Sequence, residues 1–281
     1  MPSSSFRILI TGGEGFVGRH LVRALQNLPE APEIIVGTSN GVPPHGDTAR
    51  SVALDVTDAE RVRRVIAAER PTHLFHLAAI STVAVAQKNI RRTWEINFGG
   101  TLNIAIGLSE AAPDCRLFYC SSAEVYGVSF QAGKPLDENA LLDPISAYGA
   151  SKAAADILVG QMARHGLRAI RLRPFNHTGP GQSEQFVVPA FASQIVRIER
   201  GEQDPVINVG SLSSRRDFLD VRDVVDAYVR AILRFDELPP GCVINVASGN
   251  AIRIREILDT FLSLSNKKID VVENKELLRT S

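Results

Sequence analysis

Short apolar runs alternate along the chain with longer segments whose apolar residues recur every three or four positions. The first run, Arg7–Thr11, is rich in β-branched residues, and the segment after it, Phe16–Gln26, carries apolar residues at helical spacing. The pattern predicts strands at 7–11, 33–37, 51–54, 72–77, 116–120 and 167–172, and helices at 16–26, 58–69, 93–111 and 146–165. Strands that alternate with helices form a parallel sheet with helices on both faces. The expected fold class is therefore α/β, with a doubly wound parallel sheet of the Rossmann type.

The pattern changes after Pro174. Residues 176–185 are rich in glycine, proline and polar side chains, which is typical of a loop. Smaller elements follow, with helices expected near 188–200, 221–234 and 253–264 and strands near 206–209 and 243–246. We expect residues 1–175 to form a dinucleotide-binding Rossmann domain. Residues 176–281 are expected to form a smaller α/β substrate-binding region, interleaved with returns to the main sheet.

A glycine-rich turn follows the first expected strand. Glycines stand at positions 12, 15 and 18, in the spacing G-x-x-G-x-x-G, directly before and within the first turn of a helix. In a dinucleotide fold such glycines make the tight turn, let the backbone approach a pyrophosphate, and let the helix pack close to the strand. The free N–H groups of the helix N-terminus then bind the phosphates. The cofactor-binding residues predicted here are Gly12, Gly15, Phe16, Val17 and Gly18.

The end of the second strand bears on the choice of cofactor. Dinucleotide folds often place an acid there to bind the adenosine ribose, but this strand ends in Gly37-Thr38-Ser39-Asn40, without an acid and without an arginine. Thr38 and Ser39 can donate hydrogen bonds to a 2′-phosphate. The sequence therefore favours NADP(H), with NAD(H) as the alternative. Asp55 and Val56, after the third strand, suit the adenine edge, although Asp55 fits a helix-capping role equally well.

Tyr148 and Lys152 are the strongest candidates for chemistry. Residues four apart on a helix lie on one face, so a phenol and an ammonium can meet. A nearby positive charge favours the phenolate and lowers the pKa of a tyrosine. The pair is therefore expected to exchange a proton with a sugar or alcohol oxygen near neutral pH.

Composition and charge exclude several classes of partner. The 281 residues carry 31 basic and 31 acidic side chains, so the formal net charge is zero and no basic field recruits nucleic acid or a membrane surface. No apolar run approaches the ~18 residues of a membrane span. The three cysteines lack metal-ligand spacing, so no metal site is expected. With no signal-peptide pattern, the expected location is cytoplasmic.

Seven motifs occur in an order that resembles the extended short-chain dehydrogenase/reductase family of nucleotide-sugar enzymes. They are 11–18 (TGGEGFVG), Asp55-Val56, 76–79 (HLAA), Asn97 with Gly100-Thr101, 121–127 (SSAEVYG), Tyr148 with Lys152, and 173–176 (RPFN). Within that family, segments 175–182 and 215–224 look most like the GDP-6-deoxy-D-mannose (GDP-4-keto-6-deoxy-D-mannose) reductases.

That resemblance implies a set of site residues. NADPH or NADH would bind at the glycine turn, and catalysis would fall to Ser122, Tyr148 and Lys152, with Lys152 also holding the nicotinamide ribose. Other residues implied for the cofactor are Leu77, Ala78, Ala79 and Phe175. The residues implied for a sugar nucleotide are Ser81, Glu124, Asn176, His177, Arg216 and Arg279. Family members usually continue some tens of residues further, so the C-terminal part of the substrate region is expected to be short.

The resemblance leaves several activities open. The same triad serves 4-keto reductases, 4,6-dehydratases and 4-epimerases, and reduction of a GDP-4-keto-6-deoxy-hexose is the favoured interpretation. A dehydratase needs a further acid or base, and Glu124 keeps that activity open. A non-catalytic protein that binds a nucleotide sugar or NADP is the alternative from another class. The helices at 93–111 and 146–165 resemble those that form the dimer seam in this family, so a homodimer is expected.

Overall fold

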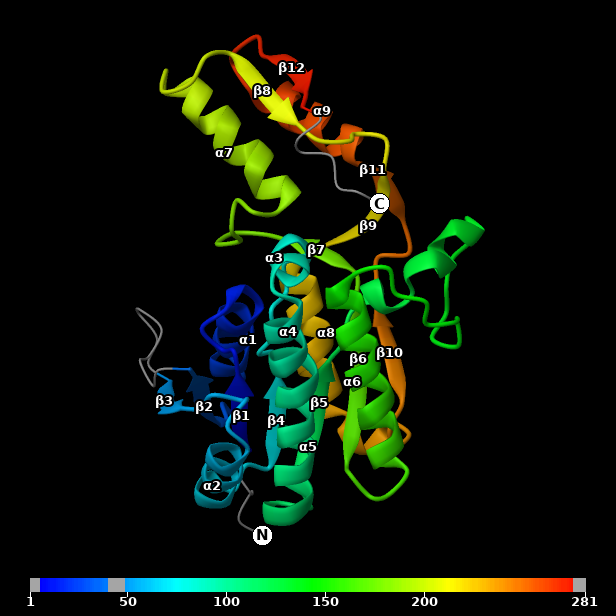
Figure 1. Ribbon diagram of the computed structural model, residues 1–281. Coiled ribbons are helices and arrows are strands. Elements are labelled where there is room, and N and C mark those ends of the chain that lie inside the picture. Colours follow the sequence, from blue (N-terminus) through cyan, green and yellow to red (C-terminus); the bar gives the residue numbers. More distant parts are fainter. Residues whose placement is uncertain (1–5, 40–48, 275–281) are drawn as a thin grey trace. The chain divides into compact units, whose positions relative to one another are not determined.

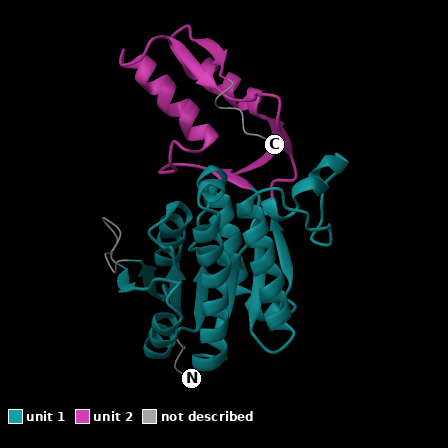
Figure 2. Ribbon diagram, viewed as in Figure 1, with its two compact units in different colours: residues 1–175, 221–246 teal, residues 176–220, 247–281 magenta. Residues whose placement is uncertain are grey.

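The computed structural model describes residues 6–39 and 49–274, which fall into two compact units (Figure 1; Figure 2). Among these residues, unit 1 runs to Phe175 and includes Val221–Val246. Unit 2 contains Asn176–Asp220 and the described residues from Ala247 onward. The chain thus leaves unit 1 directly after Phe175, returns to it for 26 residues counted from Val221 to Val246, and leaves again.

Unit 1 is built on a seven-stranded sheet in which every pair of neighbouring strands is parallel. The strand order is β10-β6-β5-β4-β1-β2-β3. The strands are β1 (Arg7–Thr11), β2 (Glu33–Thr38), β3 (Arg50–Ala53), β4 (His73–His76), β5 (Arg116–Cys120), β6 (Ala169–Pro174) and β10 (Val243–Val246). The order reverses between β1 and β4, and ligands of such sheets bind at the carboxyl ends of the strands near this point. The doubly wound fold predicted from the sequence is confirmed.

Helices cover both faces of this sheet. On one face α2 packs on α5 and α5 packs on α6, and on the other α1 packs on α8 (Figure 1). Their bounds are α1 (Phe16–Gln26), α2 (Ala59–Glu69), α5 (Gly100–Ala111), α6 (Ala147–Ala163) and α8 (Val221–Leu233). Successive side chains of a strand point to opposite faces. In β4, Leu74 joins the core under α5, whereas the ring of Phe75 lies 5.0 Å from that of Tyr228 on α8. Burial on both faces explains why these strands read as continuous apolar runs.

Shorter elements connect the main ones. They are α3 (Val83–Lys88), α4 (Ile90–Trp94) and the 3₁₀ turns η2 (Ala123–Val125), η3 (Gly127–Ala132) and η4 (Phe235–Glu237). The helical stretch predicted over 93–111 is confirmed, and a π-helical turn, η1 (Glu95–Gly99), lies within it between α4 and α5. The side chain of Asn97, in the middle of this turn, is committed to bonds with another loop, and π-bulges often occur at functional sites.

Unit 2 contains two small sheets and two helices. Strands β7 (Asn176–Thr178), β9 (Arg215–Asp220) and β11 (Ala251–Arg253) form one sheet, and β8 (Val206–Val209) pairs with β12 (Asp270–Glu273) in the other. Helices α7 (Val187–Glu199) and α9 (Ile254–Leu264) pack on each other. The prediction of a loop throughout 176–185 was wrong at its start, where β7 pairs with β9. These strands are short and polar, so their sequence lacks the alternation that reveals half-buried strands.

Candidate active site

The glycine turn lies between β1 and α1 and needs its glycines for close backbone contacts. Gly12 has a φ of +68°, and a Cβ there would lie 2.8 Å from the backbone nitrogen of Ala78. A Cβ at Gly18 would lie 2.5 Å from the Cα of Gly13. Gly15 is the N-cap residue of α1, and no side chain caps this helix end. The first turn of α1 can therefore present N–H groups to an anion, as a pyrophosphate site requires.

A buried histidine joins this turn to the loop after β4. The His76 Nδ1 lies 2.7 Å from Thr11 Oγ1, its Nε2 lies 3.1 Å from Thr101 Oγ1, and Thr11 Oγ1 also accepts a hydrogen bond of 3.3 Å from the N–H of Ala78. Burial lowers the pKa of His76 to about 3, so the imidazole is neutral at physiological pH. His76 thus positions the segment Leu77–Ala79, which the sequence assigned to the cofactor.

Tyr148 and Ser122 meet because α6 starts very close to η2. A Cβ at Gly149 would lie 2.6 Å from the backbone oxygen of Glu124, so only glycine lets the helix approach this far. Ser146 caps α6 by accepting a 3.0 Å hydrogen bond from the N–H of Gly149. Ser122 is buried, and its hydroxyl hydrogen-bonds the Tyr148 phenol. Two residues that the sequence assigned to catalysis are therefore in contact.

Lys152 lies one helical turn after Tyr148 and is almost completely buried. Its Nζ donates a 2.6 Å hydrogen bond to the backbone oxygen of Cys120 at the end of β5, and it lies 5.2 Å from the centre of the Tyr119 ring. Burial lowers the pKa of Lys152, while the nearby Cys120 thiol and the Asp156 carboxylate oppose that shift. The ammonium is thus held at the carboxyl end of the sheet, on the same helix as Tyr148.

The protonation of Tyr148 differs from the sequence expectation. Burial raises the pKa of the phenol, the hydrogen bond from Ser122 lowers it by less, and the negative charge of Glu124 raises it further. The expected lowering by Lys152 is not found because the ammonium is directed to the Cys120 carbonyl. In this arrangement Tyr148 carries its proton at neutral pH.

Asn97 is a site residue to which sequence reasoning gave no role. Its Oδ1 accepts from the N–H of Ile80 (2.8 Å), and its Nδ2 donates to the backbone oxygen of Ile80 (3.1 Å) and to Ser151 Oγ (3.0 Å). Ser151 in turn donates to the backbone oxygen of Tyr148 (2.8 Å). Asn97 therefore connects the loop after β4 to the start of α6. Its place in the family motif was the only sequence signal for it.

Residues predicted to hold the adenosine half of the cofactor lie at the ends of β2 and β3. Thr38 is buried, and its Oγ1 has no hydrogen-bond partner among the described residues, whereas Ser39 is exposed. Asp55 accepts two hydrogen bonds from Thr57, whose presence lowers the pKa of the Asp55 carboxyl. The N-cap of α2 is Asp58, which accepts from Arg61, so the capping role considered for Asp55 belongs elsewhere.

Two further cofactor candidates follow β3 and β6. Val56 is buried, in line with an apolar contact. Phe175 is half-buried at the end of β6, and its N–H donates to the backbone oxygen of Val246.

The predicted substrate residues are divided between the two units. In unit 1, Ser81 is exposed before α3, and Glu124 is half-buried in η2. In unit 2, the Asn176 Nδ2 donates a 3.4 Å hydrogen bond to the backbone oxygen of Asp217, which joins β7 to β9. Also in unit 2 are His177, on β7, and Arg216, on β9, while Arg279 lies outside the described residues.

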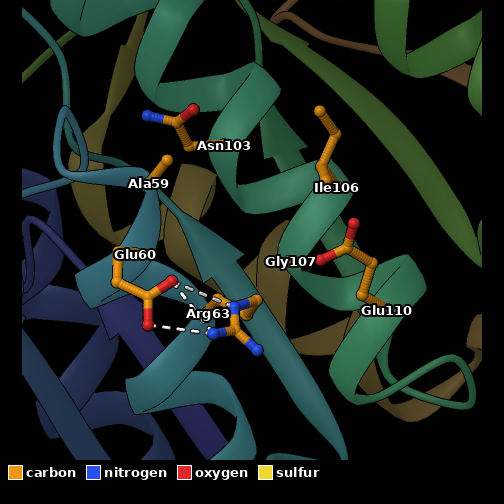
Figure 3. Close-up of a pocket in the computed structure, with 7 residues that line it drawn as sticks. All are labelled: Ala59, Glu60, Arg63, Asn103, Ile106, Gly107 and Glu110. Atoms are coloured by element: carbon orange, nitrogen blue, oxygen red, sulfur yellow. Dashed lines mark hydrogen bonds and ion pairs between the residues drawn. The ribbon is translucent and has the colours of Figure 1, made fainter.

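Another hollow on unit 1 contains none of these residues. It is a cavity of about 260 Å³ between α2 and α5, on the helical layer rather than at the strand ends (Figure 3). Glu60 and Arg63 form an ion pair of 2.9 Å on its wall.

In the part of the chain that is described, no three His, Cys, Asp or Glu side chains are arranged to hold a metal ion. None of the described helices is long and apolar enough to cross a membrane.

Comparison with known proteins assigns the family. The sequence matches the NAD dependent epimerase/dehydratase family over residues 8–247. The chain belongs to this family. Its members are NAD(P)-dependent epimerases, dehydratases and reductases of nucleotide sugars, so the family resemblance inferred from the motifs is confirmed.

Two curated relatives differ in activity. The GDP-6-deoxy-D-mannose reductase of Pseudomonas aeruginosa is 33% identical over 274 residues, which cover 97% of this chain and 84% of the relative. The UDP-glucose 4-epimerase of Streptomyces lividans is 29% identical over 273 residues, which cover 91% of this chain and 80% of the relative.

Two solved structures differ in cofactor. RMD from Pseudomonas aeruginosa, complexed with NADPH, is similar with a TM-score of 0.83 and 31% identity, covering 99% of this chain and 87% of that one. The UDP-glucose 4-epimerase of Thermus thermophilus, in complex with NAD, has a TM-score of 0.80 and 27% identity, covering 96% of this chain and 87% of that one. The family therefore uses both dinucleotides.

Proposed function

We propose that this protein reduces the 4-keto group of a GDP-4-keto-6-deoxy-hexose and so forms a GDP-6-deoxy-hexose of the GDP-D-rhamnose type. The observation that carries the proposal is the contact of buried Ser122 with a protonated Tyr148, one helical turn before a buried Lys152. This arrangement can protonate an oxygen at the carboxyl end of the sheet. The similarity to the P. aeruginosa reductase supports the choice of substrate class.

The residues of unit 1 fit a dinucleotide. The first turn of α1 has no side-chain cap and can present N–H groups to the pyrophosphate. The Thr38 hydroxyl, which has no partner among the described residues, lies at the strand end where an adenosine ribose would bind. A reduced nicotinamide, when bound, supplies the hydride that is added to C4 of the sugar. His76 and Asn97 position the loop after β4 against the turn and against α6.

Tyr148 then delivers the proton that completes the reduction. An alkoxide is a stronger base than a phenolate, so a phenol with a raised pKa still donates to the oxygen that develops negative charge. Ser122 donates a hydrogen bond to the same oxygen. Lys152, held at the Cys120 carbonyl, would bind the nicotinamide ribose and keep a positive charge at this end of the sheet. The ketone gains one hydride and one proton, and Tyr148 regains its proton from solvent.

The remaining candidates orient the sugar nucleotide. Glu124 would accept a hydrogen bond from a sugar hydroxyl, since it lies in η2, two residues after Ser122. In unit 2, Asn176 and Arg216 would bind the diphosphate, Arg216 through the paired N–H groups of its guanidinium.

The test uses the full chain with GDP-4-keto-6-deoxy-D-mannose and, in separate reactions, NADH and NADPH. The absorbance of the reduced nicotinamide is expected to fall in step with formation of the 4-hydroxy sugar. Loss of water from GDP-mannose in the presence of oxidised cofactor, without any reduction of the keto sugar, would contradict the proposal and indicate a dehydratase. Binding without either reaction would leave two alternatives, a nucleotide-sugar 4-epimerase or a non-catalytic nucleotide-sugar protein.

A second candidate is a nucleotide-sugar 4-epimerase, which the similarity to the S. lividans enzyme favours. An epimerase removes a hydride from C4 and returns it to the other face, so it consumes no added nicotinamide. Interconversion of UDP-glucose and its 4-epimer, with no net change in reduced cofactor, would support this candidate over the reductase.

A further inference from the structure

Glu14 is an unexpected residue in the glycine turn. It stands between Gly13 and Gly15, at a point where the backbone is shaped to receive phosphates. Its Oε2 is buried and has no hydrogen-bond partner among the described residues. The guanidinium of Arg19 donates a 2.9 Å hydrogen bond to the backbone oxygen of Glu14 and so fixes the turn at this residue. A buried carboxylate oxygen without a partner needs an explanation, because native structures satisfy nearly all such atoms.

The turn that carries Glu14 packs against the end of β2. The N–H of Gly12 donates a 3.1 Å hydrogen bond to the backbone oxygen of Gly37. A Cβ at Gly13 would lie 2.7 Å from a methyl group of Val36. Residues directly before Glu14 therefore touch the last residues of β2, and the next residue of that strand is Thr38.

The hydroxyl of Thr38 also lacks a hydrogen-bond partner among the described residues. Thr38 is 2% exposed. Glu14 Oε2 and the Thr38 hydroxyl are thus both buried and without partners among the described residues, as is Ser51 Oγ on the neighbouring β3. Carboxylates accept hydrogen bonds only, whereas a hydroxyl both donates and accepts. A vicinal diol, which presents two O–H donors and two oxygen acceptors, matches this pair.

We propose that Glu14 and Thr38 bind the 2′- and 3′-hydroxyls of the adenosine ribose and that Glu14 makes the protein select NAD(H) over NADP(H). A 2′-phosphate brings a charge of about −1.5 to −2 and no donor. It would remove the diol hydrogen that the carboxylate accepts and would place like charges together. The expectation of NADP(H) rested on the end of β2, where no acid stands, whereas in the structure the glycine turn that carries Glu14 packs against that strand.

The inference rests on dinucleotide binding within the proposed function and is tested without any sugar. Dissociation constants of NADH and NADPH for the full chain are measured by isothermal titration calorimetry. The wild-type protein is expected to bind NADH at least about tenfold more tightly, the factor that one charge-assisted hydrogen bond supplies. In E14Q, which keeps the shape and removes the charge, the preference is expected to fall below about threefold, mainly through tighter binding of NADPH.

Two further variants separate selectivity from general damage. E30Q removes a charge from an exposed residue outside the turn and should leave the ratio of the two constants unchanged. T38V keeps the shape of the side chain without the hydroxyl and should weaken NADH binding about threefold or more while melting near the wild-type temperature.

Equal or tighter binding of NADPH by the wild-type chain, or an E14Q ratio that matches the wild-type ratio, would overturn the inference. So would failure of both dinucleotides to bind. Selective NADH binding by a protein that reduces no keto sugar would instead overturn the proposed function alone, and turnover with preferred NADPH would overturn only the selectivity.

Discussion

At the scale of single residues, the site is organised by burial more than by charge pairing. Tyr148 keeps its proton because its phenol is desolvated, and Lys152 is directed to the backbone oxygen of Cys120 rather than to the phenol. A protonated phenol is the form that a reductase needs, since it must give up a proton to the sugar oxygen. The residue identities and their proposed roles are consistent, although the electrostatic reason differs from the one that the sequence suggested.

Replacing Tyr148 with phenylalanine should remove the proton donor while keeping the ring. We expect kcat for the keto-sugar reduction to fall by about 10²- to 10⁴-fold, the usual contribution of a positioned acid. Initial rates with saturating cofactor measure this.

Tyr126 provides the matched control, because it lacks a lysine four residues later and its hydroxyl donates a 2.7 Å hydrogen bond to Asn245 and accepts one of 2.9 Å from Arg173. Y126F should lower the free energy of unfolding by about 1 kcal/mol and change kcat by less than about threefold. Comparable rate losses in Y126F and Y148F would mean that the effect at position 148 is structural.

Two buried histidines should make stability fall with acidification. Burial lowers the pKa of His76 to about 3 and that of His73 to about 4, both below the ordinary value of 6.5. Below pH 6.5 these histidines are protonated in the unfolded chain but stay neutral in the folded chain. The free energy of unfolding should therefore decrease as pH falls from 7 toward 4. For His76 the loss by pH 4.5 is on the order of 2–3 kcal/mol.

Urea unfolding between pH 7 and pH 4.5 measures this dependence, and H76N should show a shallower one. An NMR titration of the wild-type imidazoles provides a second readout that does not require the variant to fold. Protonation of His76 with a midpoint near 6.5 in the folded protein would contradict the account.

At the residue scale, the sequence predicted which side chains form the site but not which hydrogen-bond partners they have. Ser122 and Tyr148 were both assigned before the structure placed them in contact. The bond from Lys152 to Cys120 and the bonds of Asn97 depend on distances between segments that are far apart in sequence, which no local pattern encodes. The same holds for the Glu14 oxygen, which lacks a partner within residues 6–39 and 49–274.

At the scale of elements, the start of α6 controls the geometry of the triad. Gly149 allows the helix to approach the backbone of Glu124, because a Cβ would lie 2.6 Å from its oxygen. This closeness brings Tyr148 to Ser122, and the spacing along the helix then fixes Lys152 one turn away.

Replacing Gly149 with alanine should therefore displace the first turn of α6. We expect kcat to fall at least about tenfold and the free energy of unfolding to fall by about 1–3 kcal/mol, as is typical of overpacking. Enzyme assays and urea unfolding measure the two effects.

G99A is the matched control, since Gly99 is also helical and the nearest atom to its Cβ would be 3.8 Å away. It should leave activity within about twofold and keep or increase stability. If G149A behaved like G99A, close approach of α6 to η2 could not be what positions the phenol.

Strong periodicity made the elements of unit 1 predictable, and weak periodicity hid those of unit 2. Strands β1 and β5 and helix α1 have the bounds that the sequence predicted, because their apolar runs and helical spacing are clear. The π-turn at Glu95–Gly99, in which Asn97 bonds the backbone of Ile80, has no signature in the local apolar pattern. Strands β7 and β9 were missed because backbone pairing, rather than apolar side chains, defines them.

At the scale of the whole molecule, the division into two units separates the proposed chemistry from the residues proposed to bind the sugar nucleotide. Unit 1 holds the glycine turn and the triad, while unit 2 holds Asn176, His177 and Arg216. The sequence indicated a change of pattern after Pro174, where the Rossmann alternation ends. Helix α8 and strand β10, which return to unit 1, cannot be assigned to it from their own sequence, since their partners lie far away along the chain.

The predicted homodimer can be tested at the helical face of unit 1. Helices α5 and α6 resemble the dimer helices of the family and expose apolar side chains, with Ile106 at 41% and Ile157 at 60% relative exposure. Sedimentation equilibrium should give twice the mass of the 30.5 kDa chain, and I157E should dissociate the dimer by burying an unpaired charge. A monomeric wild-type protein at micromolar concentration would contradict this prediction.

The most direct measurement of the central claim follows the hydride itself. The full chain is incubated with GDP-4-keto-6-deoxy-D-mannose and nicotinamide dinucleotide that carries deuterium at the transferable position, and the sugar product is analysed by NMR and mass spectrometry. The account predicts one deuterium per product, located at C4, and no such product from Y148F at the wild-type rate. A sugar product without deuterium at C4, or equal rates for both proteins, would contradict it.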